Sequence, residues 1–208
     1  MSTHRTLARA LRRLSRESSP GFSLVELMAF MLVMVTLAAF VLPFTRSSLN
    51  ALNLGSDARN LSSAASLAKM RAAASFTQAR IYVDLGAGTF HIERWQKNPG
   101  AWVPEGTVRM LSSTVTFGFG GLAAPPPNTQ GVIGQAAPCL DTANQPIAGT
   151  ACIVFNSRGV SVDATNTATP SGALYASDGV TVYGVTVSSG GMVQLWRANV
   201  ADAVWALN

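Results

Sequence analysis

Two cysteines are the residues of this 208-residue chain whose covalent chemistry is easiest to predict from their spacing. Cys139 and Cys152 have twelve residues between them, in a stretch rich in Gly, Pro and Thr. A disulfide at this spacing would close a loop and contribute about 3 kcal/mol in the chain-entropy model. Such a bond needs an oxidising compartment, and two buried or free thiols are the alternative. His4 and His91 are too distant in sequence to complete the ligand spacing of a zinc site, so no metal is expected.

One carboxylate is out of keeping with its surroundings. Glu26 lies at the start of an apolar run, and the sixteen residues from Leu27 to Leu42 include no charge and only Thr36 as a polar residue. A charge deep in lipid costs on the order of 2.5 kcal/mol or more. Glu26 therefore either reaches the headgroups at the interface or pairs with a cation supplied by processing or by a partner.

No arrangement of residues indicates an enzyme. The sequence has no G-x-S-x-G, no H-E-x-x-H, no P-loop and no G-x-G-x-x-G after a strand. His91 lies in a predicted strand, where a structural role is expected. Four tryptophans offer a sugar- or base-stacking face, although core and edge packing is the favoured use: Trp95, Trp102, Trp196 and Trp205. We expect no catalytic site and no cofactor.

The basic residues indicate how the N-terminal segment is oriented. The formal net charge is +5, and residues 1–20 carry +4 of it through five arginines and one glutamate. The 23 residues from Phe22 to Phe44 would form a helix of about 34 Å, enough to cross a hydrocarbon core of about 30 Å. A secretory signal is disfavoured, because the apolar run is long and Ala38-Ala39-Phe40 is a poor cleavage site. The arginines predict a cytoplasmic N-terminus, with both cysteines on the oxidising side.

The rest of the chain predicts one long helix followed by strands. Residues 46–79 contain a single Gly and a stripe at spacings of three and four, made of Leu54, Ala58, Leu61, Ala65, Ala68 and Ala72. We expect this stripe to pack on the protein's own sheet. The predicted strands are Arg80–Leu85, Thr89–Trp95, Val108–Phe119, Cys152–Phe155, Ala173–Ala176, Val180–Val187 and Met192–Ala198, with 120–150 as a long irregular loop. Helix and antiparallel strands give an α+β fold.

The N-terminal segment resembles the type IV prepilins. Pro20-Gly21-Phe22-Ser23-Leu24-Val25-Glu26-Leu27 is similar to their cleavage and methylation motif, and Pro43 stands at the twenty-second position after Gly21, where pilins commonly kink the helix. The resemblance implies cleavage between Gly21 and Phe22 by a prepilin peptidase, N-methylation of Phe22, and an assembly role for Glu26. It also implies the pilin fold and three parts: a leader (1–21), a transmembrane and assembly helix (22–45) and a periplasmic globular domain (46–208).

Residues 21–198 resemble the GspH/FimT group more narrowly, through the order of helix, hairpin, Phe155-to-Gly159 segment and closing hairpin. This resemblance implies a minor pseudopilin of a type II secretion system in the bacterial inner membrane, which later joins a periplasmic filament. Its partners would be the prepilin peptidase/methyltransferase, other pseudopilins and the inner-membrane assembly platform. The alternatives are a minor type IV pilin, a DNA receptor subunit, and an anchored periplasmic protein that never assembles.

Nucleic acid is not an expected partner. Some members of the group bind DNA through basic residues of the last hairpin, where this chain has Gly191-Met192-Val193-Gln194 followed only by Arg197. Phosphate binding needs several cations on one face, and residues 47–208 hold nine basic and eight acidic residues.

Overall fold

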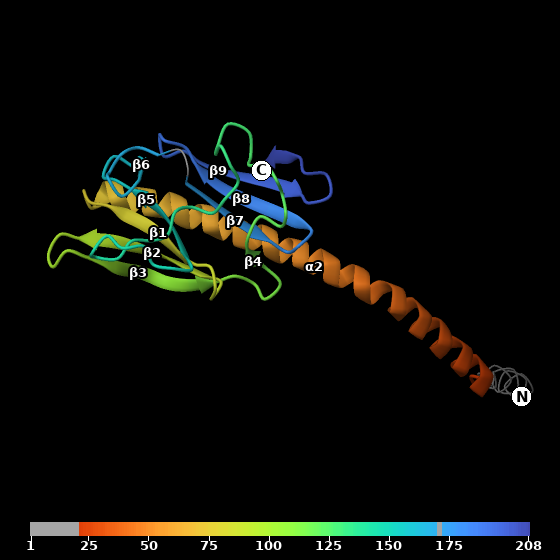
Figure 1. Cartoon of the computed structure of the whole chain (residues 1–208). Helices are drawn as coiled ribbons and strands as arrows, with labels where there is room; N and C mark the ends of the chain where they lie inside the picture. The colour runs from red at the N-terminus through yellow and green to blue at the C-terminus, as the bar shows by residue number, and fades with distance from the viewer. Residues whose placement is uncertain (1–20, 170–171) are drawn as a thin grey trace, which may run out of the picture. The chain divides into compact units, whose positions relative to one another are not determined.

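The computed structural model of the chain describes residues 21–169 and 172–208 (Figure 1). The predicted leader lies outside the described residues except for Gly21. The chain divides into two compact units, Met1–Arg46 and Ser47–Asn208. One α-helix, α2 (Leu24–Ala74), begins in the first unit and ends in the second. Within the described ranges, no helix combines the length and the apolar character that crossing a membrane requires.

The helix α2 ends in a Schellman motif, five residues before the predicted end. Phe76 has a φ of 49°, and Thr77 N–H donates to the carbonyl of Ala72 at 3.3 Å while Phe76 N–H donates to that of Ala73 at 3.4 Å. These bonds satisfy carbonyls that the last turn would otherwise leave unpaired. The position usually belongs to glycine, because a left-handed backbone strains any residue with a Cβ. Phe76 nevertheless occupies it with 81% of its surface exposed.

Ten strands follow α2 in the described part of the chain and form two antiparallel sheets. They are β1 Ala79–Asp84, β2 Thr89–Gln96, β3 Ala101–Met110, β4 Thr116–Phe117, β5 Thr150–Phe155, β6 Ser161–Val162, β7 Gly172–Ser177, β8 Thr181–Val187, β9 Val193–Asn199 and β10 Trp205–Leu207. Sheet A has the order β3-β2-β1-β5-β6 and sheet B the order β10-β9-β8-β7-β4. The α+β class is therefore confirmed, with two sheets where one was expected.

The predicted strand Val108–Phe119 is wrong. The strand β3 starts seven residues earlier, at Ala101, and ends at Met110. After it, Ser112 N–H donates to the carboxylate of Asp57 on α2 at 2.8 Å, and Val115 N–H donates to the carbonyl of Ser112. This turn ends the pairing with β2, so the remaining residues join sheet B as β4. The long loop from 120 to 150 is confirmed, because strand structure resumes only at Thr150.

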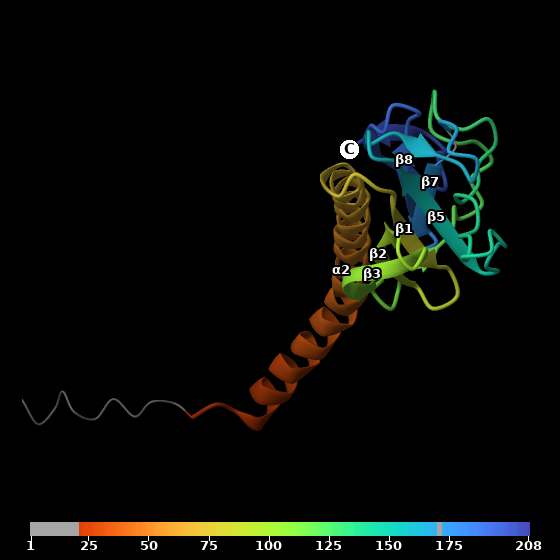
Figure 2. The ribbon, with the colours of Figure 1, turned by 90° about the vertical axis from the view of Figure 1, so that its left-hand side faces the viewer.

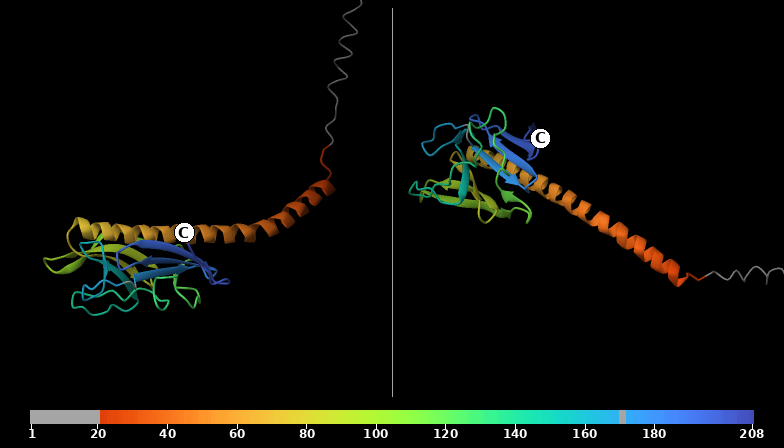
Figure 3. Two further views of the ribbon diagram at one scale, coloured as in Figure 1. Left: turned by 90° about the horizontal axis from the view of Figure 1, so that it is seen from above. Right: turned by 45° about the vertical axis from the view of Figure 1, so that its right-hand side comes forward.

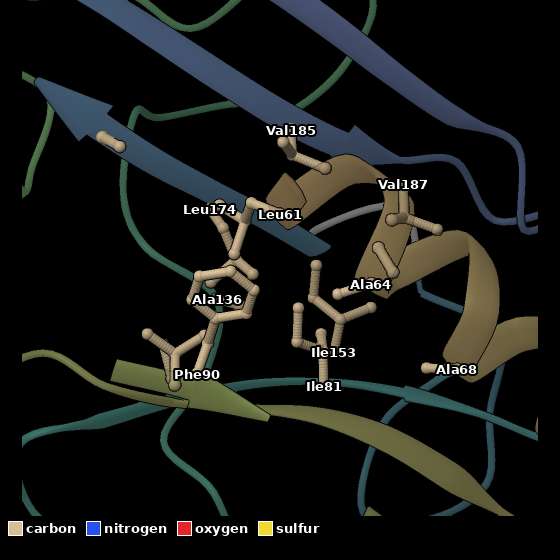
Figure 4. Close-up of a cluster of buried hydrophobic side chains, with 14 of the residues drawn as sticks. Leu61, Ala64, Ala68, Ile81, Phe90, Ala136, Ile153, Leu174, Val185 and Val187 are labelled. Atoms are coloured by element: carbon tan, nitrogen blue, oxygen red, sulfur yellow. The ribbon is translucent and has the colours of Figure 1, made fainter. Parts of the chain in front are cut away.

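Within the second unit, the predicted helical stripe forms the centre of the core. All six of its residues are buried, and Leu61 is 1% exposed. Figure 4 shows Leu61, Ala64 and Ala68 of α2 facing Ile81 and Ile153 of sheet A and Val185 and Val187 of sheet B. Figures 2 and 3 show both sheets on the same side of this part of the helix. The prediction that the stripe packs on the protein's own strands is confirmed.

Close backbone packing joins the last hairpin to the turn after β5. A Cβ built on Gly191, in the β8–β9 turn, would lie 1.8 Å from the carbonyl oxygen of Gly159. Gly191 also has a φ of 76°. Both facts require a residue without a side chain at this position.

Candidate functional site

The residues of the cleavage motif lie at the entrance to α2. Residues 21–23 precede the helix, and Phe22 is 83% exposed. The first turn is closed by Leu27 N–H, which donates to the carbonyl of Ser23 at 3.1 Å. The peptide bond between Gly21 and Phe22 is thus outside regular structure, and a Cβ built on Gly21 would meet no atom within 4 Å. A protease needs this kind of accessible backbone.

Glu26 lies in the first turn of α2, where the helix dipole favours a negative charge. Its side chain is exposed, and no salt bridge involves it within the described residues. Around and beyond it, thirteen large apolar side chains between residues 22 and 40 are each at least half exposed, including Phe22, Phe30 and Phe40. Such a continuous apolar surface is typical of a segment that binds lipid or other chains.

Pro43 lies inside α2, which is continuous from Leu24 to Ala74. Because proline has no N–H, the helix lacks the hydrogen bond that residue 43 would donate to the carbonyl of Ala39. The role of Pro43 in bending an assembled helix therefore stays a prediction.

In the globular unit, Cys139 and Cys152 are joined by a disulfide with a Cα–Cα distance of 4.9 Å. The bond ties the long loop to β5, and backbone hydrogen bonds support it on both sides. Cys152 N–H donates to the carbonyl of Ala137 at 2.9 Å, and Cys139 N–H donates to Oγ1 of Thr150 at 3.0 Å. The loop is therefore fixed over the face of sheet A that points away from α2.

A buried ion pair occupies that outer face of sheet A. The Arg80 guanidinium donates from Nε to Glu93 Oε2 at 2.6 Å and from Nη1 to the carbonyl of Leu140 at 2.7 Å, and its Nη2 forms an ion pair with Glu93 Oε2 at 2.6 Å. Its Cζ lies 4.1 Å from the centroid of the Trp102 ring. Burial lowers the pKa of Arg80, while Glu93 acts in the opposite direction. With its charge balanced by Glu93 and each of its three nitrogens in contact with an acceptor, Arg80 positions Trp102 and the loop.

His91 has the structural role that its strand position predicted. Its Nε2 lies 3.2 Å from Glu93 Oε1, and its ring stacks on Tyr82 with centroids 4.9 Å apart.

The Arg80–Glu93 ion pair was not predicted from the sequence. A three-residue turn at 86–88 would pair Arg80 with Arg94, whereas the chain turns over the four residues 85–88, which pairs Asp84 with Thr89 and Arg80 with Glu93.

The four tryptophans are divided between the sheets rather than gathered on one face. Trp196 Nε1 donates to Thr186 Oγ1 at 3.0 Å, and Trp205 Nε1 donates to the carbonyl of Ala124 at 2.9 Å. Trp95 and Trp102 face each other across β2 and β3, with ring centroids 5.3 Å apart at an interplanar angle of 67°. This pair borders hollows at the surface of sheet A.

The closing hairpin carries little positive charge. Arg197 is exposed on β9, and no other Lys or Arg occurs between Thr181 and Asn199. The strands β8 and β9 therefore carry a single cationic side chain.

Comparison with known proteins gives a distant structural likeness. No known family model matches this chain, and no curated protein matches it in sequence. Among solved structures, it is similar to the crystal structure of the minor pseudopilin EpsH from the type II secretion system of Vibrio cholerae, with a TM-score of 0.42 and 12% identity over 69% of this chain and 92% of that one. A second structure of EpsH from the same system gives a TM-score of 0.38 and 12% identity over 69% and 95%. Because the likeness is distant, the function of this chain has to be inferred from its own residues.

Proposed function

We propose that this chain is a pilin-like structural subunit, a minor pseudopilin of a type II secretion system. It is made with a basic leader, cut between Gly21 and Phe22 by a prepilin peptidase, methylated on Phe22 and assembled through α2 into a periplasmic filament. The observation that carries the proposal is the Gly21-to-Glu26 motif at the exposed, non-helical entrance of a 51-residue helix. The role is structural, without catalysis.

Cleavage would supply the cation that Glu26 lacks. A new α-amino group on Phe22 has a pKa near 8 and is mostly protonated at neutral pH. It would lie about one helical turn from Glu26, within reach of the same or a neighbouring subunit. A buried carboxylate is tolerated in an apolar bundle when it is paired and is strongly destabilising when it is alone. This pairing would fix the axial position of each subunit as it joins the filament.

Before assembly, the exposed apolar residues between 22 and 40 would reside in the inner membrane, with the leader cytoplasmic and residues 47–208 periplasmic. The arginines of the leader support this orientation. Removal of the leader would also remove the charges that oppose extraction of the helix from the bilayer. An oxidising periplasm would be compatible with the Cys139–Cys152 disulfide.

Assembly can be tested through Glu26 in cells that express the sister pseudopilins. Membranes carrying Glu26→Leu should yield at least about tenfold less cross-linked or co-purified sister subunit than membranes carrying the natural chain. The substitution leaves the α-amino group of Phe22 without its carboxylate, and an uncompensated buried charge costs several kcal/mol. Glu26→Asp should retain part of the interaction. The matched control is Asp202→Asn, an exposed carboxylate far along the sequence. Unchanged co-purification of Glu26→Leu would contradict the pairing assigned to Glu26, and no co-purification of the natural chain would favour an anchored protein that never assembles.

A further inference from the structure

Trp95 stands at the junction of three hollows on the globular unit. The first, of about 350 Å³, lies between Trp95, Trp102, Pro138 and Val162. The second, of about 310 Å³, shares Trp95 with the first, and the third, of about 340 Å³, shares Trp95 with the second. Shared walls make the three hollows neighbours along one part of the surface. They form what we call the Trp95 trough.

The trough contains an aromatic ring at each end and one in the middle. Trp102 lines the first hollow and Phe76 the third, with Trp95 common to all three. No hydrogen bond from the indole N–H of Trp95 or Trp102 is found within the described residues, and neither nitrogen is among the buried unpaired atoms. Both N–H groups therefore remain accessible as donors. Phe76 is exposed despite its strained backbone, which is the kind of strain that persists at functional sites.

The polar lining consists mainly of uncharged amides and hydroxyls. Asn156 Oδ1 accepts hydrogen bonds from the N–H groups of Arg158 and Val160, and Asn166 Oδ1 accepts one from Gln78 Nε2 at 3.4 Å. Both asparagines line the second hollow together with Gln78, and these hydrogen bonds engage their Oδ1 atoms and not their NH₂ groups. Amides fixed in this way recognise hydroxyl and carbonyl groups.

The charged residues along the trough do not favour a ligand with a large net charge. Arg80 lies at the base of the first hollow, but its guanidinium is taken up by Glu93 and Leu140. Arg94 in the third hollow lies 3.9 Å from Glu105 Oε2, Lys97 lines the second and third hollows, and Asp163 lines the first. A long neutral ligand therefore fits better than a polyanion, whose binding needs several unpaired cations.

The strands at the centre of the trough do not offer a free backbone edge. β2 is paired with β1 and β3, and β1 is paired with β2 and β5, whereas the edge strands of sheet A are β3 and β6, which carry Trp102 and Val162. A peptide that lies over Trp95 would thus find no strand edge to extend there, although such an edge is the commonest source of main-chain affinity for an extended peptide on a sheet. Aromatic faces beside amides and hydroxyls, with an apolar recess at one end, match a different ligand.

We propose that the Trp95 trough binds a linear glycan of N-acetylated hexosamines. The apolar faces of successive sugar rings would stack on Phe76 and Trp95, and the hydroxyls would bond to Asn156 and Asn166. An acetyl methyl group would enter the apolar recess beside Trp102, Pro138 and Val162. Binding is independent of cleavage at Gly21, so the proposal stands or falls separately from the proposed function.

The probe is chitohexaose, a β-1,4-linked hexamer of N-acetylglucosamine, titrated by calorimetry into the full-length chain. The micelle should be a zwitterionic detergent, because a maltoside headgroup is itself a sugar. We expect saturable binding, about tenfold weaker for Trp95→Ala. The control is Trp196→Phe, on sheet B, which should leave the affinity unchanged.

Phe76→Gly separates binding from folding. It removes an exposed ring and relieves a left-handed backbone, so we expect weaker chitohexaose binding with a midpoint of unfolding at or above that of the natural chain. Absence of chitohexaose binding at millimolar concentration, or equal binding by Trp95→Ala, overturns the proposal. Equal affinity for cellohexaose overturns the N-acetyl assignment. If no sugar binds, but a proline-rich peptide or single-stranded DNA does and loses affinity in Trp95→Ala, that ligand replaces the glycan in the proposal.

Discussion

The ion pair between Arg80 and Glu93 allows a quantitative prediction for the globular unit. Arg80→Met keeps much of the side-chain length and removes the charge. It would leave the Glu93 carboxylate, 10% exposed, with His91 as its remaining side-chain partner, and the carbonyl of Leu140 without its donor. Removing one member of a buried pair typically costs about 3–5 kcal/mol. We expect a loss of about 4 kcal/mol in the free energy of unfolding.

Removing both charges should restore most of that stability. In Arg80→Met/Glu93→Leu no buried charge is left alone, so the remaining losses are the bond to Leu140 and the contact with Trp102, together about 1–2 kcal/mol. The assay is urea unfolding of the full-length chain in detergent, followed by tryptophan fluorescence. A loss below about 1 kcal/mol for Arg80→Met would show that solvent screens the pair as it does at a surface. A double variant as unstable as the single one would refute the role assigned to the isolated carboxylate.

Three further predictions concern single features of the globular unit. Gly191→Ala should lower the free energy of unfolding by at least about 2 kcal/mol in the same assay, since its Cβ would overlap the carbonyl of Gly159; a neutral effect would contradict this packing. Cys139→Ser/Cys152→Ser should lose about 3 kcal/mol, because the bond closes a loop with a sequence separation of 13; unchanged stability under non-reducing conditions would contradict it. Hydrogen bonds from Thr165 and Thr167 lower the pKa of Asp163, so ionisation of this carboxylate stabilises the fold above its unfolded pKa of about 4, and this contribution is lost as the pH falls through the folded pKa. A carboxyl ¹³C titration by NMR should place the midpoint of Asp163 below that of a model peptide, and a midpoint above it would be inconsistent with the turn.

The sequence predicted the elements whose signals are local. The spacing of Leu54, Ala58 and Leu61 was sufficient to identify the buried face of α2, because a helix repeats every 3.6 residues. The turn at 86–88 likewise predicted the β1–β2 hairpin. In contrast, the end of α2 depended on Phe76 adopting a conformation that residues with a Cβ rarely favour, so the predicted helix ran five residues too far.

Features that depend on distant contacts were not predictable from one sequence. The run 108–119 alternates well for a single strand, yet Asp57 of α2 captures Ser112 N–H and ends β3. The two-sheet arrangement depends on such switches. The Trp95 trough joins residues from the end of α2, from β2 and from the turns after β5 and β6, and only the folded chain brings them together.

The N-terminus of the mature chain gives the most direct test of the central claim. The protein should be isolated from the membranes of cells that express a prepilin peptidase, and its intact mass and N-terminal peptide measured by mass spectrometry. We predict a chain that begins at Phe22 and carries one methyl group on its α-amine, while Gly21→Leu keeps the leader and Gly55→Ala, a glycine change inside α2, does not. A natural chain that still begins at its original N-terminus, or at a residue beyond Phe22, would contradict the assignment of this protein as a processed pilin-like subunit.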